Sequence, residues 1–261
     1  MTILDTIADY ARIRVAEAKK QVPLEQMRER AKALDANTGF PFEQALRGQD
    51  ITFICEVKKA SPSRGIIAED FPYLQIAKEY EAAGANAISV LTEPKWFKGD
   101  GSYLQEIANT VSIPCIRKDF IVDEYQIYEA KTLGASAILL IVSLLDTPTL
   151  RRYRELAESL GMSALVETHD DGEVASAIEA GVTIIGVNNR NLKDFTVDFS
   201  NSARLRPLVP QGTIFVAESG VETPEDINEL RKAGTDAVLI GETLMRATDK
   251  KQALDHLKTG C

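Results

Sequence analysis

Charged and amide side chains occur where short apolar runs of the sequence end. These residues are Glu56, Lys58, Lys118, Glu167, Asn188, Arg190 and Glu218. Glu56 and Lys58 are two positions apart, so in a strand their side chains point to the same side. On a buried face, such an acid and base are costly unless they pair or serve chemistry. Two lysines and three glutamates could supply acids and bases to a reaction without a cofactor.

A second group of residues is suited to bind an anion. Gly220 and Gly241 each follow an apolar run, and Glu242 begins a helical segment. Glycine lets the backbone come close to a ligand, and N–H groups at the start of a helix attract phosphate. The Glu242 carboxylate would repel phosphate, so we expect only its N–H group to help. The alternative is that both glycines simply turn the chain.

Three other segments carry weaker signals. The loop segment 61–65, Ser-Pro-Ser-Arg-Gly, is rich in hydroxyl groups. The pair Trp96-Phe97 could either sandwich a planar ring or form a hydrophobic cap. We interpret His169 and His256 as surface residues without partners for a metal or a catalytic triad. No cluster of Cys, His and carboxylate residues has the spacing of metal ligands, so we expect neither a metal nor a cofactor.

A repeated pattern shows which elements could position these residues. It consists of a helical pattern, a glycine, two or three small residues and a short apolar run. The five copies are AAGANAISVL (82–91), TLGASAILLI (132–141), SLGMSALVE (159–167), EAGVTIIGV (179–187) and KAGTDAVLIG (232–241). The glycine fits the end of a helix, and the apolar run fits a strand buried on both faces.

With three further apolar runs, the chain has eight expected strands. They lie at about 52–58, 87–91, 114–118, 136–141, 163–167, 183–188, 213–217 and 236–240. Helices are predicted at about 72–83, 102–110, 123–133, 147–160, 170–180, 200–206 and 223–232, with a final helix after 241.

Strict alternation of strand and helix predicts an α/β protein with parallel strands, and eight such units predict a closed (β/α)8 barrel, the TIM-barrel fold. A doubly wound open sheet is the alternative. That fold usually carries a glycine-rich nucleotide turn, and neither G-x-G-x-x-G nor a P-loop is present. In a barrel, the polar residues at the strand ends would all meet at the C-terminal mouth.

The residues before the first strand are expected to form a helical extension. An amphipathic helix is predicted at 3–20 and a short helix at 41–46. We expect residues 1–47 to act as a lid or a brace. No linker rich in Pro, Gly or Ser divides the chain, so residues 1–261 are expected to form a single barrel domain.

Composition limits the partners of the chain. Its 261 residues include 30 Lys and Arg against 39 Asp and Glu, a net charge of −9, which argues against nucleic acid but permits a small phosphorylated substrate. The longest apolar run, 138–145, is too short for a membrane span, and no secretory signal is present. The three cysteines suit neither a disulfide framework nor a metal site. We expect a cytoplasmic protein that is a monomer or a weak homodimer.

Several motifs together resemble the indole-3-glycerol phosphate synthase family. They are EVKKASPS (56–63), SVLTE (89–93), FKG (97–99), RKDFIV (117–122), LVE (165–167), NNRNL (188–192) and AESG (217–220). The resemblance covers nearly the whole chain, and the first and sixth motifs are specific in combination. Asp100 stands where many members have Ser, and Arg64 where Lys is frequent, but neither belongs to the expected catalytic set.

The resemblance implies a lyase of tryptophan biosynthesis. Its substrate would be 1-(2-carboxyphenylamino)-1-deoxyribulose 5-phosphate, which undergoes ring closure, decarboxylation and dehydration. Lys118 would be the acid for ring closure, and Lys58 would contact the carboxylate or serve dehydration. Glu167 would stabilise positive charge or act as a base. The implied catalytic residues are Glu56, Lys58, Lys118, Glu167, Asn188 and Glu218. The implied substrate-binding residues are Ser61, Phe97, Phe120, Arg190, Ser219, Gly220, Gly241 and Glu242.

Three other functions stay open at this point. Phosphoribosylanthranilate isomerase is a related kind of phosphate-binding barrel, but its chemistry typically needs a carboxylic acid with a Cys or Asp rather than two lysines. A Schiff-base aldolase could use Lys118 or Lys58. A barrel that binds sugar phosphates without turnover is the non-enzymatic alternative.

Overall fold

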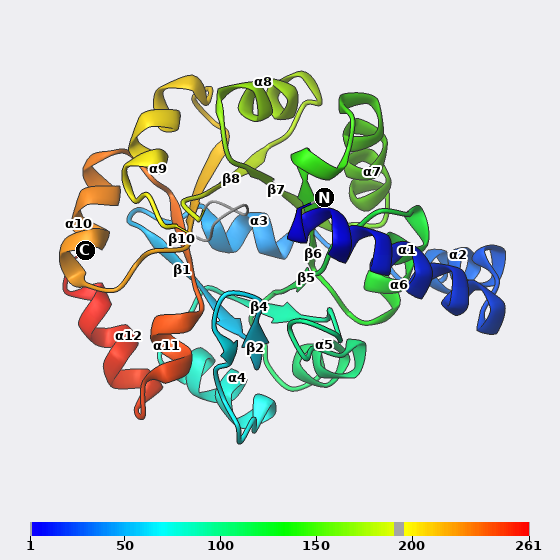
Figure 1. Cartoon of the computed structure of the whole chain (residues 1–261), viewed down its shortest axis with the longest axis horizontal. Helices are drawn as coiled ribbons and strands as arrows, with labels where there is room; N and C mark the ends of the chain where they lie inside the picture. Colours follow the sequence, from blue (N-terminus) through cyan, green and yellow to red (C-terminus); the bar gives the residue numbers. More distant parts are fainter. Residues whose placement is uncertain (1, 191–195, 261) are drawn as a thin grey trace.

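A computed structural model describes residues 2–190 and 196–260 of the chain. Its central feature is a ring of strands surrounded by helices (Figure 1). The strands of the ring are β1 (Thr52–Val57), β4 (Ala87–Leu91), β5 (Cys115–Lys118), β6 (Ala137–Ile141), β7 (Ser163–Thr168), β8 (Ile184–Asn188), β9 (Ile214–Glu218) and β10 (Ala237–Ile240). Every neighbouring pair among them is parallel, and β1 pairs with both β4 and β10. The predicted closed (β/α)8 barrel is therefore confirmed.

The helices alternate with these strands as the sequence predicts. They are α4 (Tyr73–Ala82), α5 (Gly101–Ala108), α6 (Glu124–Thr132), α7 (Thr147–Ser159), α8 (Asp171–Glu179), α9 (Ser200–Leu205), α10 (Pro224–Lys232), α11 (Glu242–Arg246) and α12 (Lys250–Lys258), with short 3-10 turns η1 (Val142–Leu144) and η2 (Arg206–Leu208). The glycines of the five repeats, at 84, 134, 161, 181 and 234, all have φ between 76° and 83°. This left-handed conformation ends the preceding helix and turns the chain into the next strand.

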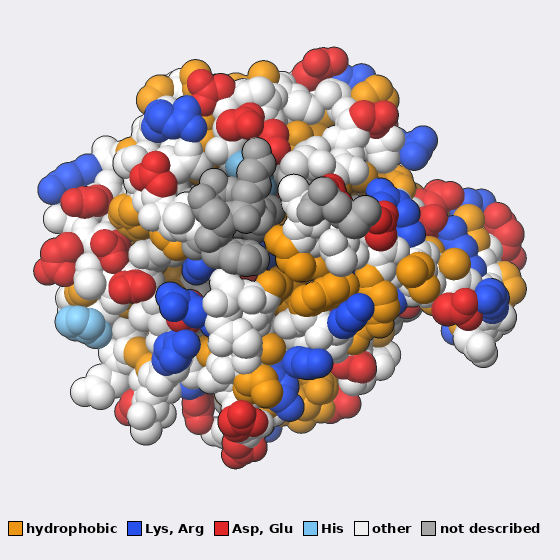
Figure 2. Space-filling model, viewed as in Figure 1, with side chains coloured by type: hydrophobic (Ala, Val, Ile, Leu, Met, Phe, Trp, Pro, Cys, Tyr) orange, Lys and Arg blue, Asp and Glu red, His pale blue; other side chains and the backbone are white. Residues whose placement is uncertain are grey.

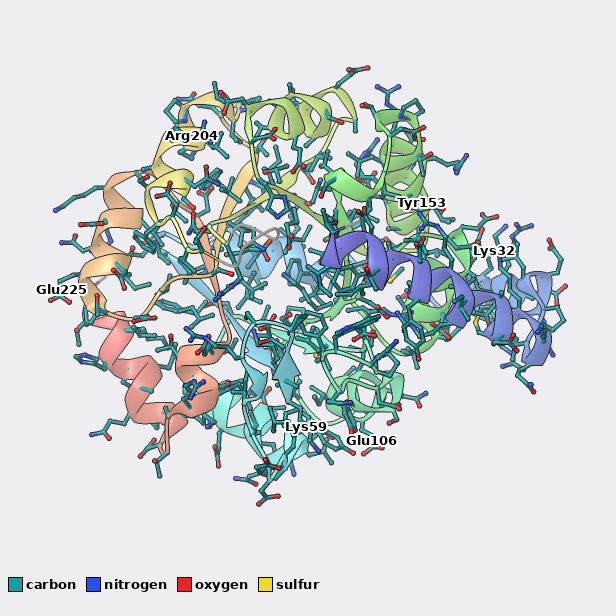
Figure 3. The ribbon with its side chains drawn as sticks, in the orientation of Figure 1. Lys32, Lys59, Glu106, Tyr153, Arg204 and Glu225 are labelled. Atoms are coloured by element: carbon teal, nitrogen blue, oxygen red, sulfur yellow. The ribbon has the colours of Figure 1, made fainter. Side chains whose placement is uncertain are left out.

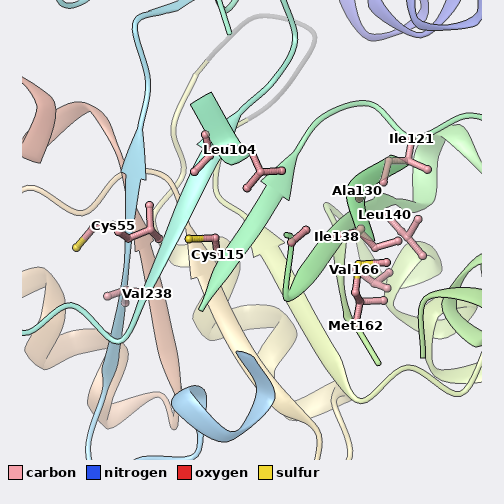
Figure 4. Packing of buried hydrophobic residues seen from close by; sticks show 14 of the residues in the cluster. Cys55, Leu104, Cys115, Ile121, Ala130, Ile138, Leu140, Met162, Val166 and Val238 are labelled. Atoms are coloured by element: carbon pink, nitrogen blue, oxygen red, sulfur yellow. The ribbon is translucent and has the colours of Figure 1, made fainter. Parts of the chain in front are cut away.

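Alternation along each strand separates two apolar layers. Ile54, Ile116 and Leu165 belong to the layer inside the barrel. Cys55, Val57, Cys115, Ile138, Leu140 and Val166 belong to the larger layer between the strands and the helices (Figure 4). The predicted orientation of Cys55 and Val57 toward the helices is thus confirmed, and the odd-numbered neighbours leave Glu56 and Lys58 to the interior.

The two ends of the barrel are closed differently. Helix α3 (Pro41–Leu46) lies at the N-terminal end, where Phe42 and Leu46 join the interior layer and Glu43 accepts a hydrogen bond from Thr183, just before β8. Helix α1 (Ile3–Gln21) lies across the opposite end (Figure 1). Its Arg14 holds the buried Asp119, which directly follows β5, at 2.7 Å.

Three local features were not predicted. Helix α2 (Leu24–Lys32) follows Pro23, and its Met27 and Ala31 are buried. A small hairpin of β2 (Ala60–Ser61) and β3 (Gly65–Ile66) forms in the loop after β1. The final helix is in fact two helices, α11 and α12. Across the described residues, no helix combines the length and apolar character that crossing a bilayer requires.

Candidate active site

One cavity lies at the C-terminal mouth of the barrel. Among its lining residues are all fourteen that the sequence analysis assigns to catalysis or substrate binding: Glu56, Lys58, Ser61, Phe97, Lys118, Phe120, Glu167, Asn188, Arg190, Glu218, Ser219, Gly220, Gly241 and Glu242. By contrast, Lys32, Arg204 and Glu225 point outward from the surrounding helices, away from the mouth (Figure 3). The charged residues at the strand ends, including the buried Glu56, Glu167 and Glu218, therefore meet in this cavity.

Lys118 lies at the centre of this charge. Its Nζ pairs with Oε2 of Glu218 and lies 3.5 Å from Oε2 of Glu167. Burial acts to lower the pKa of Lys118, but the negative charges of Glu218, Glu167 and Glu56 outweigh it and hold that pKa above the usual value. Lys118 is therefore a cation near neutral pH.

The two glutamates beside Lys118 differ in their pKa values. Burial raises the pKa of Glu218 to about 7, with the charges of Glu167 and Glu56 adding to the shift and Lys118 opposing it. Burial also acts to raise the pKa of Glu167, but Lys118, His169 and Asn188 lower it to about 2. Near neutral pH, Glu167 is thus a carboxylate and Glu218 is close to its titration point.

Gly186 makes room for Glu218. A Cβ atom at Gly186 would collide with Oε1 of Glu218 and come within 3.2 Å of Leu165 Cδ1. Sequence reasoning missed this glycine, although a glycine inside a strand is a recognised sign that another group approaches closely.

Glu56 and Lys58 form a second acid–base pair at the end of β1. A Cβ atom at Gly241 would collide with Oε2 of Glu56 and lie 2.8 Å from Nζ of Lys58. A side chain at residue 241 would therefore displace this pair, and Gly241 is also available to a ligand. The sequence analysis considered only the ligand.

The turn after β9 has a conformation that side chains rarely adopt. Ser219 has φ 67° and Gly220 has φ 90°. Buried Asn189 holds this turn, because its Nδ2 donates to the Ser219 carbonyl at 3.0 Å and its Oδ1 accepts from Ser202 on α9. This bond directs the Ser219 carbonyl toward Asn189. Gly220, the next residue, lines the cavity.

Glu242 is surrounded by arginines. Its carboxylate lies 3.0 Å from Nε of Arg64, 3.1 Å from Nε of Arg246 and 3.9 Å from Nη2 of Arg190. Basic side chains gather near the centre of the face shown in Figure 2. The repulsion that we expect between Glu242 and a phosphate is therefore offset by neighbouring positive charge.

The side chains of Trp96 and Phe97 pack in different places. Phe97 lines the cavity with its ring centroid 5.9 Å from that of Phe120, whereas Trp96 packs edge-on against Tyr10 of α1 at 5.5 Å. The fully buried Glu93 fixes this loop by accepting the backbone N–H groups of Lys95, Trp96 and Phe97. Only Phe97 of the pair can face a planar ring in the cavity.

The interpretation of His169 as a surface residue is wrong, because its side chain is only 18% exposed and lies between two carboxylates. Its Nε2 lies 3.3 Å from Oε1 of Glu167, and its Nδ1 lies 3.0 Å from Oε2 of Glu173 on α8. The spacing of four residues between His169 and Glu173 was the available signal. His256 is exposed on α12, as expected.

Two further expectations concern the end of the sixth motif and the absence of a metal site. Asn191 and Leu192, the end of the sixth motif, lie outside the described residues. Among the residues that the structure does describe, no group of three or more His, Cys, Asp and Glu side chains could hold a metal ion.

The fold and the cavity together define a (β/α)8-barrel protein with an acid–base site at its C-terminal mouth. A sequence model of the family "Indole-3-glycerol phosphate synthase" matches residues 4–257. The chain is 56% identical to the indole-3-glycerol phosphate synthase of Ruminiclostridium cellulolyticum over 98% of both chains, and 51% identical to that of Lacticaseibacillus casei over 98% of both. This chain belongs to the indole-3-glycerol phosphate synthase family.

A solved structure shows the same fold without close sequence similarity. The crystal structure of a 3-hexulose-6-phosphate synthase matches with a TM-score of 0.65 at 15% identity, covering 80% of this chain and 99% of that one. At this identity the match supports the barrel architecture alone.

Proposed function

We propose that this protein converts 1-(2-carboxyphenylamino)-1-deoxyribulose 5-phosphate to indole-3-glycerol phosphate, CO2 and water in tryptophan biosynthesis. The observation that carries the proposal is the position of Lys118, which lies between Glu167 and Glu218 inside the cavity. A buried cation beside two carboxylates can protonate a carbonyl, and membership of the family supplies the substrate that needs this.

Ring closure is the first task of the site. An aromatic carbon attacks the C2′ carbonyl, and the carbonyl oxygen receives a proton from Lys118 as the bond forms. Glu218 stands against the same Nζ atom, and its pKa of about 7 suits it to exchange that proton near neutral pH. The ionised Glu167 stabilises the positive charge that develops on the substrate's nitrogen and ring.

Decarboxylation and dehydration follow in the same cavity. Loss of CO2 restores the π-system, and loss of the C2′ hydroxyl then requires an acid while a base removes a proton. Lys58, oriented by Glu56, is the second cation available for carboxylate contact or for protonating the leaving hydroxyl. Glu167 is the base that the geometry offers, and Asn188 supports it with a hydrogen bond.

The remaining cavity residues bind the two ends of the substrate. The phosphate lies against the turn of Ser219 and Gly220 and the backbone at Gly241 and Glu242, with Arg190 nearby. The anthranilate ring lies near Phe97 and Phe120, and Ser61 contributes a hydroxyl from the first loop. We also expect the chain to be a single, cytoplasmic barrel domain and a monomer or weak homodimer, with residues 1–47 acting as a lid or a brace. These expectations stay predictions.

The direct test is turnover of the substrate by the purified protein. Indole formation is followed by absorbance or fluorescence, and CO2 release is measured in parallel, with one CO2 expected per indole. Substrate binding without CO2 would contradict the proposal in favour of a non-catalytic barrel. Inactivation by borohydride in the presence of substrate would indicate a Schiff-base aldolase instead.

A further inference from the structure

His169 lines a second cavity, which shares Asn188 with the lining of the catalytic cavity. It follows the end of β7, and its side chain is only 18% exposed. The second cavity is lined by His169 and Glu173 together with Asn188 and with Thr2 and Asp5 from the N-terminal region. Nothing in the proposed reaction gives this histidine a task.

Glu173 fixes the orientation of the imidazole. Its Oε2 accepts the backbone N–H of His169 at 2.8 Å and lies 3.0 Å from the ring Nδ1. Asn201 on α9 donates to the His169 carbonyl at 3.2 Å. With its backbone and one ring nitrogen held, the histidine presents its other nitrogen, Nε2, to Oε1 of Glu167.

The two neighbouring carboxylates favour the cationic form of the ring. A neutral imidazole has one N–H and one lone pair. With carboxylates at both nitrogens, the neutral ring would turn its lone pair toward one of them, whereas the cation presents an N–H to each. Nε2 is buried and has no hydrogen-bond partner among the described residues, so its contact with Glu167 at 3.3 Å acts mainly through charge.

We propose that His169 is a positioning residue that holds the Glu167 carboxylate ionised and oriented through its Oε1 atom, while Lys118 contacts Oε2. Glu167 is then held between two cations, and its buried charge does not need to be neutralised by a proton. The inference rests on the proposed function, because it assigns His169 a role in that reaction through Glu167.

The surrounding charges support this assignment. Glu167 faces Lys118 on β5, Asn188 on β8 and the carboxylate of Glu218 on β9, and Glu218 is also influenced by the charge of Glu56 on β1. Apart from His169 and Lys118, these neighbours bring no positive charge to Glu167. Burial acts to lower the pKa of His169, but Glu167 and Glu173 raise it to about 10.

The test compares three variants of the full chain: His169→Gln, Glu173→Gln and the matched control His256→Gln. His169→Gln keeps hydrogen-bonding capacity but removes the charge. We expect kcat to fall roughly 10- to 100-fold with KM within about twofold, because misplacing one reacting group commonly costs this much. The acidic limb of the pH–kcat profile should move to higher pH, since the Glu167 carboxylate loses a cation. Glu173→Gln should produce a smaller change of the same kind, and His256→Gln none.

A double mutant separates positioning from a structural role. In the Glu167→Gln background, His169→Gln should lower kcat by no more than about twofold, because the carboxylate on which it acts is absent. An equal loss in both backgrounds, or an unchanged pH–kcat profile in single variants that fold normally, would overturn the proposal. If His169→Gln does not fold, Glu173→Gln provides the same comparison.

NMR titration of the His169 ring distinguishes failure of this inference from failure of the proposed function. The wild-type ring should remain protonated well above pH 7, and its titration should shift to lower pH in Glu167→Gln. This result is expected whatever substrate the protein uses, whereas a ring that titrates near its ordinary value of 6.5 would refute the contact itself. A wild-type protein without turnover would refute only the proposed function.

Discussion

Three glutamates share the barrel mouth, and their neighbours give two of them different protonation behaviour. Glu167 has a pKa of about 2, because Lys118 and His169 outweigh the effect of burial, while burial sets the pKa of Glu218 at about 7. The same residue type can therefore hold a fixed negative charge at one position and exchange a proton at another. The burial and the neighbouring charges of each glutamate, rather than its residue type, therefore decide its role.

Replacing Lys118 tests the proposed acid of ring closure. Lys118→Ala should lower kcat by roughly 10²–10⁴-fold, the usual cost of losing a positioned general acid, while the fold is retained. Lys59→Ala is the matched control, because Lys59 follows Lys58 but does not line the cavity. Steady-state kinetics and circular dichroism of both variants provide the measurement. A Lys118→Ala enzyme with wild-type rates would remove Lys118 from the mechanism.

Glu167→Gln tests whether the carboxylate acts in the transition state. The amide retains size and hydrogen bonding but loses charge and basicity, so kcat should fall far more than KM rises. A purely structural glutamate would behave in the opposite way, with normal kcat and a lower melting temperature. Measuring kcat, KM and melting temperature on one purified sample distinguishes the two roles.

At the scale of elements, the glycines that follow β9 and β10 differ in which side chains lie next to them. Gly220 has φ 90°, and an added Cβ would lie 2.7 Å from Val197 Cγ1, whereas an added Cβ at Gly241 would displace the Glu56–Lys58 pair. Gly220→Ala should therefore raise KM for the phosphorylated substrate by about tenfold, or roughly 1.4 kcal/mol of binding. Gly241→Ala should instead lower kcat.

The control for Gly220→Ala is Gly212→Ala. Gly212 also has a positive φ, of 88°, but nothing lies within 4 Å of its missing Cβ, so this variant reports backbone strain without crowding at the site. Kinetics with substrate and binding of inorganic phosphate separate the two effects. If neither Gly220→Ala nor Gly241→Ala changes phosphate binding, the phosphate lies elsewhere on the barrel.

Most elements could be predicted because their signals are local. Each repeat carries a helix-ending glycine and a strand buried on both faces, and the strand at 87–91 agrees residue for residue with β4. Helix α2 could not be predicted, because only Met27 and Ala31 of its nine residues are buried and its stability comes from packing on α6.

The site could be predicted in position but not in pairing. Alternation along the strands indicates that Lys118 and Glu218 face the interior, yet they are 100 residues apart, and only the closed barrel brings them into contact. The contact between His169 and Glu167 is instead local, because the two residues are two positions apart, and Glu173 four residues after His169 was an available signal. Around Glu242, only Arg246 is related by a local pattern, the spacing of four residues on α11, whereas Arg64 and Arg190 are brought to it by the fold.

At the scale of the whole molecule, the stability of the fold should depend on the charge of His169. Its pKa rises from 6.5 to about 10 on folding, so the stabilisation is fully present below pH 6.5 and is lost as the pH approaches 10. The free energy of unfolding of the wild type should exceed that of His169→Gln by on the order of a few kcal/mol near pH 6, and the difference should shrink as the pH rises.

Chemical denaturation at a series of pH values measures this difference. The raised pKa of Glu218 also makes the folded state less stable as the pH increases. Because Glu218 is present in both proteins, its contribution cancels in the difference between them. A difference that is constant between pH 6 and 10, or that grows, would mean that the imidazolium does not stabilise the native state.

Because β1 pairs with β10, the barrel can close during synthesis only after β10 has been made. Thr52 pairs with Ala237, so the first strand of the barrel has no partner on one side until the residues of β10 have left the ribosome. Before then, the nascent sheet has two free edges, and such edges recruit other chains. A chain ending at Asp236 should therefore self-associate, detectable by sedimentation, and late translation is the interval in which this protein most needs protection from its neighbours.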